Sequence, residues 1–501
     1  MSTIRKQSLI SSGIVYFGFA LGLLNTYLFT RQGGFTEAQY GLTGTFLAFA
    51  NIMFAVAGLG MPAYVGKFFP YYKAHLADRD NDQLTWALLF SSLGFLFVLL
   101  AGILFKNILV DKVFNNSPQL LQFYYWTFPF GFGFTLFMTM ESFAWQQRKA
   151  VLSNFLKEVL FRFLVTVLIV LTTLRVIHDF STFIAVYAFL YLAIALFLII
   201  YFMRRRQFYI RLSPSRVTRR FRSKILTLLT FVWGGGLVFN VASVFDTIVI
   251  AAILPDGMAA VAPFLLAQNI SSLMQAPQRA VVSAAVGPLS QAWKEKNYGK
   301  INSIYHRSSI NQLVFSCAMF CLIWLNFEDG VHTFHLQEKY IVAKWIFFFI
   351  GLSKIIDMGT GVNAQIIATS TFWRFECMSG VMLLALTLPL DWLLTQRLGI
   401  MGPAIATLFS FSMYNLIRCI FLWKKFRMQP FTLHTLYTLL LSLGAYLLCH
   451  LLFGQFEGFG FIVLRSLCFV ALFGGGAVLL KLSPDLMPVL RSLGKRLGLG
   501  R

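Results

Sequence analysis

The chain contains fourteen long apolar stretches separated by short loops, and this pattern limits its fold more than any other feature. Each stretch can cross the ~30 Å of hydrocarbon in a bilayer as a helix that rises about 1.5 Å per residue. Because 58% of the 501 residues are hydrophobic and 12% are charged, there is too little polar surface to cover a soluble globule. The sequence therefore predicts an all-α polytopic membrane protein with about fourteen transmembrane helices. The predicted spans lie near residues 9–30, 41–65, 84–104, 120–141, 154–174, 181–203, 225–254, 259–288, 309–326, 340–370, 377–394, 401–423, 433–453 and 459–480.

Lys and Arg concentrate in every second loop. The largest group lies between residues 204 and 224, whereas the alternate loops hold few basic residues, such as Arg31, Arg175 and Lys339. Cytoplasmic loops of membrane proteins carry an excess of Lys and Arg, so the alternation predicts that both termini are cytoplasmic. The net charge of +23 then reflects attraction to anionic headgroups, and no nucleic acid is expected as a partner. The N-terminal run is interpreted as a retained first helix because no cleavage site of a signal peptide follows it.

No cofactor or metal is expected. All six cysteines fall in or at the ends of apolar stretches, where they pack as small residues. His332 and His335 lie close together in a loop beside Glu328 and Asp329, which is interpreted as a solvated loop and not as a metal site. The chain has no phosphate-binding G-x-x-x-x-G-K-[ST] motif. Energy for any transport is therefore expected from an ion gradient, the membrane potential or consumption of the substrate.

Two lobes are predicted from a weak internal repeat. The second span ends in GMPAYVGKFFPYYKAHLADRD and the eighth in AVGPLSQAWKEKNYGK. Both pieces contain Gly and Pro, and both have basic residues where the chain leaves the membrane on the cytoplasmic side. Two six-helix lobes in a pseudo-two-fold arrangement are a recurring transporter plan that places the site at the lobe interface. The expected division is an N-terminal lobe, a basic cytoplasmic linker, a C-terminal lobe, and two additional helices with a basic tail, at 1–207, 208–224, 225–428 and 429–501.

The stretches QAPQRAVVSAAVGPLSQAWKEKNYGKINSIYHRSS and LSKIIDMGTGVNAQIIATSTFWR resemble the polysaccharide-transporter branch of the multidrug/oligosaccharidyl-lipid/polysaccharide exporter superfamily, as does the layout of fourteen spans. The resemblance implies a flippase in the bacterial cytoplasmic membrane that moves a lipid-linked oligosaccharide, a polyprenyl-pyrophosphate glycan, by alternating access for polysaccharide biosynthesis. It implies membrane lipids and polysaccharide-assembly enzymes as partners. A lipid II flippase and a drug/cation antiporter of the same superfamily are the alternatives. A membrane glycosyltransferase would need a large loop with paired carboxylates, so we expect no enzyme.

Ionisable residues inside spans are costly unless they face a partner or a wet cavity. Lys354 and Asp357 lie near the middle of the tenth span and share one helix face because they are three residues apart. Lys354 is a candidate to bind the diphosphate and Asp357 to couple transport to an ion; alternatively, the two side chains neutralise each other. The following Gly359 to Asn363 stretch suits either a broken helix or close packing, and Asn363 is a further candidate substrate contact.

Arg279 and Asp246 are the remaining candidates. Arg279 follows Pro277 in the eighth span and offers a planar guanidinium for a pyrophosphate; the alternative is that it reaches nearby headgroups. Asp246 lies in the outer half of the seventh span and is a candidate ion-coupling residue, or else a buried carboxylate paired with a base such as Arg279. Other charges are expected to be structural. Glu158 and Arg162 form an intrahelical pair, and the side chains of three further residues reach the interface: Lys344, Arg418 and Arg465.

Overall fold

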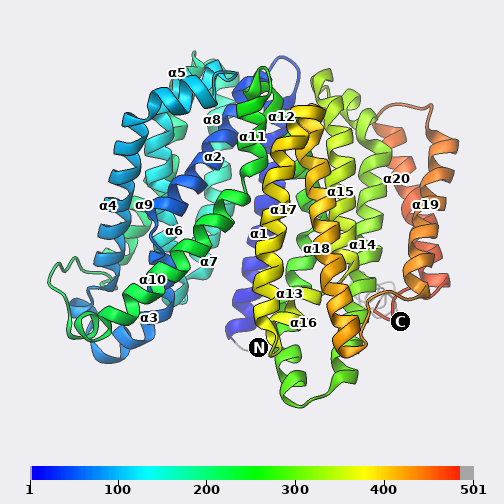
Figure 1. Cartoon of the computed structure of the whole chain (residues 1–501). Helices are drawn as coiled ribbons and strands as arrows, with labels where there is room; N and C mark the ends of the chain where they lie inside the picture. The colour runs from blue at the N-terminus through cyan, green and yellow to red at the C-terminus, as the bar shows by residue number, and fades with distance from the viewer. Residues whose placement is uncertain (1–2, 486–501) are drawn as a thin grey trace. The chain divides into compact units, whose positions relative to one another are not determined.

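The computed structural model describes residues 3–485, and within them it contains α-helices joined by short turns and no β-strand (Figure 1). Ten stretches of this part are long and apolar enough to cross a membrane by length and composition, and one of them, Arg374–Phe426, holds two helices. The prediction of an all-α polytopic membrane protein is thereby confirmed. The expected basic tail beyond residue 485 lies outside the described residues.

The chain separates into two compact units, Met1–Leu265 and Leu266–Arg501. The helices of unit 1 are α1 (Thr3–Thr30), α2 (Glu37–Ala57), α3 (Met61–His75), α4 (Gln83–Leu104), α5 (Pro118–Phe123), α6 (Thr127–Gln146), α7 (Ala150–Asn154), the π-helical turn η4 (Phe155–Leu160), α8 (Phe161–Thr173), α9 (Phe180–Arg204), α10 (Arg216–Ala242) and α11 (Phe245–Ile253). Shorter turns are η1 (Asp78–Asp80), η2 (Ile108–Val113) and η3 (Tyr124–Trp126). The boundary between the units falls inside α12 (Gly257–Met274).

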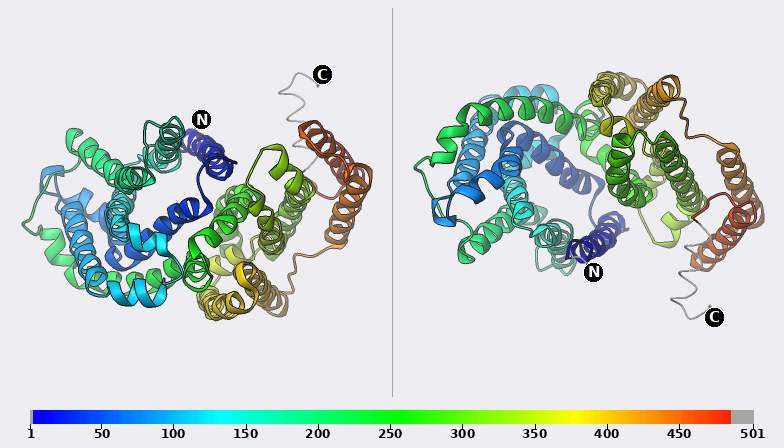
Figure 2. Two further views of the ribbon diagram at one scale, coloured as in Figure 1. Left: turned by 90° about the horizontal axis from the view of Figure 1, so that it is seen from above. Right: turned by 90° about the horizontal axis from the view of Figure 1, so that it is seen from below.

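Unit 2 continues with α13 (Ala276–Lys294), α14 (Tyr298–Thr333), η5 (Glu338–Val342), α15 (Ala343–Gly359), α16 (Asn363–Thr369), α17 (Trp373–Leu398), η6 (Gly399–Met401), α18 (Gly402–Phe426), α19 (Leu433–Phe453) and α20 (Phe459–Leu479). The long helix α14 packs against α13, α15, α19 and α20, while α18 packs against α15 and α17. The views along the helices show α19 and α20 side by side at the edge of this unit (Figure 2).

Each of the fourteen predicted spans falls on one or more helices, but several are interrupted. The second predicted span is divided between α2 and α3, the seventh between α10 and α11, the eighth between α12 and α13, and the tenth between α15 and α16. A sequence scan for apolar length does not detect such breaks because only one to three residues separate the two helices at each of them. The second predicted span of each expected lobe is thus a divided helix.

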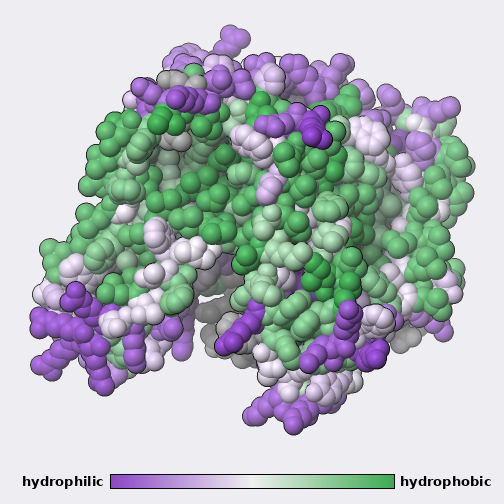
Figure 3. All heavy atoms as spheres, viewed as in Figure 1, coloured by the Kyte–Doolittle hydropathy of each residue, from purple (hydrophilic) through white to green (hydrophobic). Residues whose placement is uncertain are grey.

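The compact units divide the chain later than the basic linker at which the sequence predicts the lobes to separate. α10 begins inside that linker, yet it packs on α2 and α3 of unit 1, and α11 packs on α2. In the space-filling view hydrophobic side chains cover the middle of the helices of each unit, and hydrophilic side chains gather at their ends (Figure 3). This distribution is what a helix bundle needs when its flanks contact lipid and its ends contact water.

Aromatic side chains fill the interior of unit 1. Phe130 of α6 stacks on Tyr187 of α9 with ring centroids 5.0 Å apart, and Phe161 of α8 stacks on Tyr191 of α9 at 4.3 Å. Phe130 is fully buried. Part of the aromatic run between residues 123 and 134 therefore packs helix against helix, where offset and edge-on rings add to the packing energy.

Candidate functional site

The polar centre of unit 2 lies where the tenth predicted span is interrupted. α15 ends at Gly359 and α16 begins at Asn363. Between them Gly361 has φ of 64°, a left-handed conformation that glycine adopts without steric cost. A Cβ atom on Gly361 would lie 2.8 Å from the Oγ of Ser308 on α14. Glycine at this position thus permits both the turn and the close approach of α14.

Two serines of α14 bind backbone groups that the interruption leaves outside the helical hydrogen-bond ladder. The Ser309 hydroxyl donates to the carbonyl of Gly359, and the amide of Val362 donates to the Ser308 hydroxyl at 3.3 Å. An unsatisfied backbone group inside a membrane costs several kcal/mol, so these partners stabilise the break. The broken helix and the close packing, which the sequence leaves as alternatives, occur together.

Asp357 lies one turn before this break and accepts hydrogen bonds from two amide side chains. Gln278 on α13 donates from Nε2 to Oδ2 at 2.8 Å, and Asn415 on α18 donates from Nδ2 to Oδ1 at 3.2 Å. Both donors are neutral, so they bring no opposite charge to the carboxylate. Asp357 of α15 is therefore tied by hydrogen bonds to α13 and α18.

Asn415 connects Asp357 to the broken helix. Its Oδ1 accepts from the hydroxyl of Thr360 and from the side-chain amide of Asn363, each at 2.9 Å. Asn415 is 1% exposed and Asn363 is 2% exposed. A buried amide with donor and acceptor both engaged fixes its own orientation, and the structure thus brings together two of the sequence-predicted residues, Asp357 and Asn363, through one that was not predicted.

Lys354 is half-buried one turn before Asp357 on α15. Its Nζ lies 5.5 Å from the ring centroid of Phe411 on α18, within the range of a cation–π interaction. Phe411 precedes Asn415 by one helical turn on α18, as Lys354 precedes Asp357 by one turn on α15. Lys354 therefore contacts Phe411, and Asp357 contacts Asn415. The predicted sharing of one face by Lys354 and Asp357 agrees with this arrangement.

The other two candidates lie in the first turns of α13 and α11. Arg279 is exposed in the first turn of α13, next to the Gln278 that binds Asp357. Asp246 is half-buried in the first turn of α11 and belongs to unit 1. The interruption between α10 and α11 places Asp246 near a helix N-terminus, where the backbone amides favour a negative charge.

Two arginines that the sequence assigns to the membrane interface are instead buried. Arg418 of α18 forms an ion pair with Glu376 of α17 and lies over the ring of Tyr414 at 3.6 Å. Arg465 of α20 pairs with Asp329 of α14 at 3.2 Å, and both side chains are nearly inaccessible. The prediction that these side chains extend to headgroups is wrong, because an acidic residue on a neighbouring helix compensates each charge. The predicted Glu158–Arg162 pair is present, with a separation of 3.0 Å.

Sequence reasoning missed Gln278, Thr360 and Asn415. Amides and hydroxyls carry no charge, so a search for charges inside spans passes over them. The one available signal was position, since Gln278 adjoins Arg279, Thr360 lies within the glycine-rich break, and Asn415 falls near the middle of an apolar span. Polar residues at such depth mark helix contacts or a transport path.

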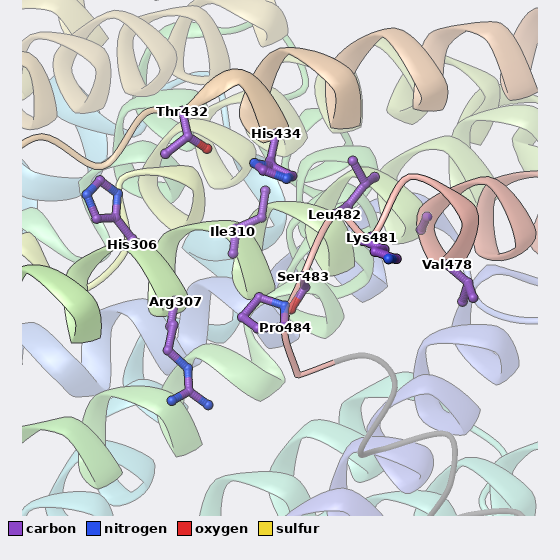
Figure 4. Close-up of a pocket in the computed structure, with 11 residues that line it drawn as sticks. His306, Arg307, Ile310, Thr432, His434, Val478, Lys481, Leu482, Ser483 and Pro484 are labelled. Carbon is purple, nitrogen blue, oxygen red and sulfur yellow. The ribbon is translucent and has the colours of Figure 1, made fainter.

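A cavity of about 490 Å³ lies at the end of unit 2 that the sequence predicts to be cytoplasmic (Figure 4). Its walls are formed by α14, by the start of α19 with the chain before it, and by the end of α20 with the chain after it. It is lined by His306, Arg307, Ile310, Thr432, His434, Ala477, Val478, Lys481, Leu482, Ser483 and Pro484. Asp485 forms an ion pair with Arg307, and Asn311 donates to its Oδ2 at 2.6 Å. Part of the positive charge of this cavity is thus compensated by the chain itself.

The described part of unit 2 thus combines an interrupted helix with a half-buried carboxylate beside the break. No protein-family model matches the sequence, and no curated protein matches it. Among solved structures, the lipid II flippase MurJ in an inward closed conformation is similar over 94% of this chain and 98% of that chain, with a TM-score of 0.73 and 15% identity.

Two multidrug transporter structures are also similar. The match to an inward-facing MATE family transporter of the MOP superfamily covers 82% of this chain and 94% of the transporter chain, with a TM-score of 0.62 and 16% identity. A mutant of the Vibrio cholerae MATE transporter VcmN covers 85% of this chain and 98% of its own, with a TM-score of 0.53 and 16% identity. The chain thus has the fold of MOP-superfamily transporters, in agreement with the sequence resemblance.

Proposed function

We propose that the protein is a flippase that moves a polyprenyl-pyrophosphate-linked oligosaccharide across the bacterial cytoplasmic membrane by alternating access, for polysaccharide biosynthesis. Both termini are then cytoplasmic, and the expected lobes at 1–207 and 225–428 are the moving parts. The lipid-linked oligosaccharide and membrane lipids are its partners, and enzymes of polysaccharide assembly act before or after it.

The polar network around Asp357 is the observation that carries this proposal. It joins α13, α15, α16 and α18 at an interrupted helix, and a basic residue, Lys354, lies one turn away. A carboxylate, an amide and a hydroxyl side by side are able to bind a proton or a hard cation. A nearby ammonium attracts a diphosphate. In this proposal Asp357 couples transport to an ion, while Lys354 and Arg279 bind the diphosphate.

The structural likeness is compatible with a lipid flippase and with a drug/cation antiporter, because it extends over 94% of this chain for the lipid II flippase and 82% for the inward-facing MATE transporter. A lipid II flippase is the second candidate. The two candidates differ in the sugar and peptide portion of the substrate but share the polyprenyl diphosphate.

Transbilayer movement in proteoliposomes tests the proposal. The purified protein is reconstituted with a fluorescent polyprenyl-pyrophosphate oligosaccharide, and a membrane-impermeant quencher reports the fraction in the outer leaflet over time. We expect Lys354→Gln and Arg279→Gln each to lower the initial rate about tenfold, the effect of losing ~1.4 kcal/mol of binding. Fluorescent lipid II in the same assay decides between the two lipid substrates.

Lys344→Gln is the matched control, because Lys344 lies on the same helix as Lys354 but forms an ion pair with Glu328 at 2.9 Å. It should reduce the rate little if the protein accumulates normally. If the Lys354 and Arg279 variants fold and move the glycan at the rate of the unmodified protein, the diphosphate site is wrong. If the unmodified protein moves neither lipid but exchanges cationic drugs, the flippase assignment itself is wrong.

A further inference from the structure

Unit 1 contains a larger cavity of different chemistry. It has a volume of about 770 Å³ and opens among α3, α4 and α10, all within the same unit. Most of its walls are apolar, with guanidinium groups near one end. The lining residues are Leu59, Met61, Tyr64, Trp86, Phe90, Pro214, Thr218, Arg219, Arg222, Ile225, Leu226, Leu229, Thr230 and Trp233. We refer to this cavity as the α10 groove.

One face of α10 carries both the charge and much of the apolar wall. Arg219 and Arg222 are three residues apart, and Leu226, Leu229 and Trp233 continue the same face at helical spacing. Both arginines are exposed. Within residues 3–485 neither takes part in an ion pair, in contrast to Arg162, Arg418 and Arg465. The groove therefore offers two uncompensated cations at the start of an apolar stripe.

A chain of hydrogen bonds behind the groove lies within unit 1. Tyr64 shares a hydrogen bond with Tyr72 at 2.8 Å, Tyr72 with Thr218 at 2.7 Å, and Thr218 donates to Asp82 at 2.7 Å. Asp82 is fully buried, and its Oδ2 also accepts from the backbone amide of Ser215, which caps α10. Asp82 thus holds the start of α10 in place and forms no ion pair with Arg219 or Arg222 within residues 3–485.

Two features at the apolar walls point to an occupant. The indole Nε1 of Trp86 is buried without a hydrogen-bond partner among the described residues. At the far end, Trp233 donates to the carbonyls of Ala55 and Val56 at 3.0 and 3.1 Å, next to the turn in which Leu59 has φ of 46°. Such a conformation is unfavourable for a branched side chain. A ligand packed on Leu59 would help to hold this turn.

We propose that the α10 groove binds one anionic phospholipid from the leaflet that contacts the basic linker. Its phosphate lies between Arg219 and Arg222, and an acyl chain follows the apolar stripe to Trp233. Trp233 lies fourteen positions after Arg219, which is a rise of about 21 Å along α10. This length matches one leaflet of a bilayer that is about 40–45 Å thick with its headgroups. This lipid is a resident partner of unit 1, and its binding does not depend on which substrate is transported.

Lipid binding to the purified full-length protein tests the proposal. The protein is delipidated in detergent and titrated with phosphatidylglycerol, and bound lipid is counted by native mass spectrometry while thermal unfolding is followed. We expect one phosphatidylglycerol to be retained and to raise the unfolding temperature, and phosphatidylcholine to bind more weakly. Replacing both Arg219 and Arg222 by Gln should weaken phosphatidylglycerol binding about thirty-fold, as expected for two contacts of ~1 kcal/mol each.

The matched control removes the same charge from the same helix outside the groove. Arg216 and Arg220 are exposed on α10 and do not line the cavity, so their double replacement by Gln should leave binding within about twofold. Leu229→Trp, which fills the apolar part and keeps both arginines, should also weaken binding. The proposal is overturned if both arginine pairs contribute equally, which would indicate general attraction to a basic surface. It is also overturned if inorganic phosphate or polyprenyl pyrophosphate displaces the lipid.

Discussion

Asn415 donates a hydrogen bond to Asp357 from one end of its amide and accepts from Thr360 and Asn363 at the other. This single side chain therefore links the carboxylate of α15 to both sides of the helix interruption. If Asp357 binds the coupling ion, as proposed, Asn415 connects the ion site directly to the broken helix.

Asn415→Leu should destabilise the protein and uncouple the break from Asp357. Leucine keeps the approximate size but leaves Asp357 Oδ1, Thr360 and Asn363 without their shared partner, at a cost of ~2 kcal/mol. Thermal unfolding in detergent measures the loss. Ser412→Ala on the same helix is the control, since the Ser412 hydroxyl bonds only its own helix at Leu408. Equal unfolding temperatures of the two variants would contradict a linking role for Asn415.

Asp357→Asn should separate transport from its driving ion. The substituted amide retains an oxygen that accepts from one neighbour but cannot take up a proton or balance a cation. We expect exchange of labelled lipid between leaflets to continue while its acceleration by an imposed proton or sodium gradient disappears. Asp78→Asn is a control because Asp78 lies in a surface pair with Lys73 at 2.6 Å. A gradient effect of normal size in the Asp357 variant would exclude this residue as the coupling group.

The membrane architecture was readable from the sequence because it depends on apolar length and on the distribution of Lys and Arg, which are local properties. The place of Asp357 and Lys354 on one membrane-length helix was readable for the same reason. The pairing of Arg418 with Glu376 was not, because 42 residues separate them and nothing local specifies the contact between α17 and α18. An arginine near a span end avoids lipid either by extending to the headgroups or by pairing with an acidic residue of a neighbouring helix. The sequence does not show which of the two occurs.

The Asp357 network shows the same limit at the candidate site. Gly359 to Asn363 suited a broken helix or close packing, and the hydrogen-bond partners of this stretch are Ser308, Ser309 and Asn415, which lie fifty or more residues away on other helices. These partners are uncharged and common in transmembrane helices. Their importance follows from where α14 and α18 place them, which is a property of packing and not of residue type.

The buried pair between Arg465 and Asp329 should be essential for holding α20 against α14. Arg465 also donates to the carbonyls of Leu325 and Phe456, at 3.0 and 2.7 Å, so its charge is fully enclosed by protein groups. Arg465→Gln leaves the Asp329 carboxylate buried without its partner, which should cost about 3 kcal/mol. Faster proteolysis in the loop between α19 and α20 measures the loosening. Lys73→Gln, at an exposed pair, should change cleavage little, and similar cleavage of both variants would contradict the prediction.

The pair between Asp485 and Arg307 should release the chain after α20 in acid. The hydrogen bond from Arg307 is the main cause that lowers the pKa of Asp485. Because the pKa is lowered in the folded state, the stabilisation is complete above the ordinary carboxyl pKa of about 3.9 and is lost as the pH falls through the lower folded value.

Hydrogen exchange at residues 481–485 measures this release. The unmodified protein and the Asp485→Asn variant are compared at the same pH, so that the intrinsic pH dependence of exchange cancels. The unmodified protein should be better protected at neutral pH, with the difference vanishing in strong acid. Arg307→Gln should reproduce the Asn variant, and equal protection of all three proteins at neutral pH would show that the pair does not hold this segment.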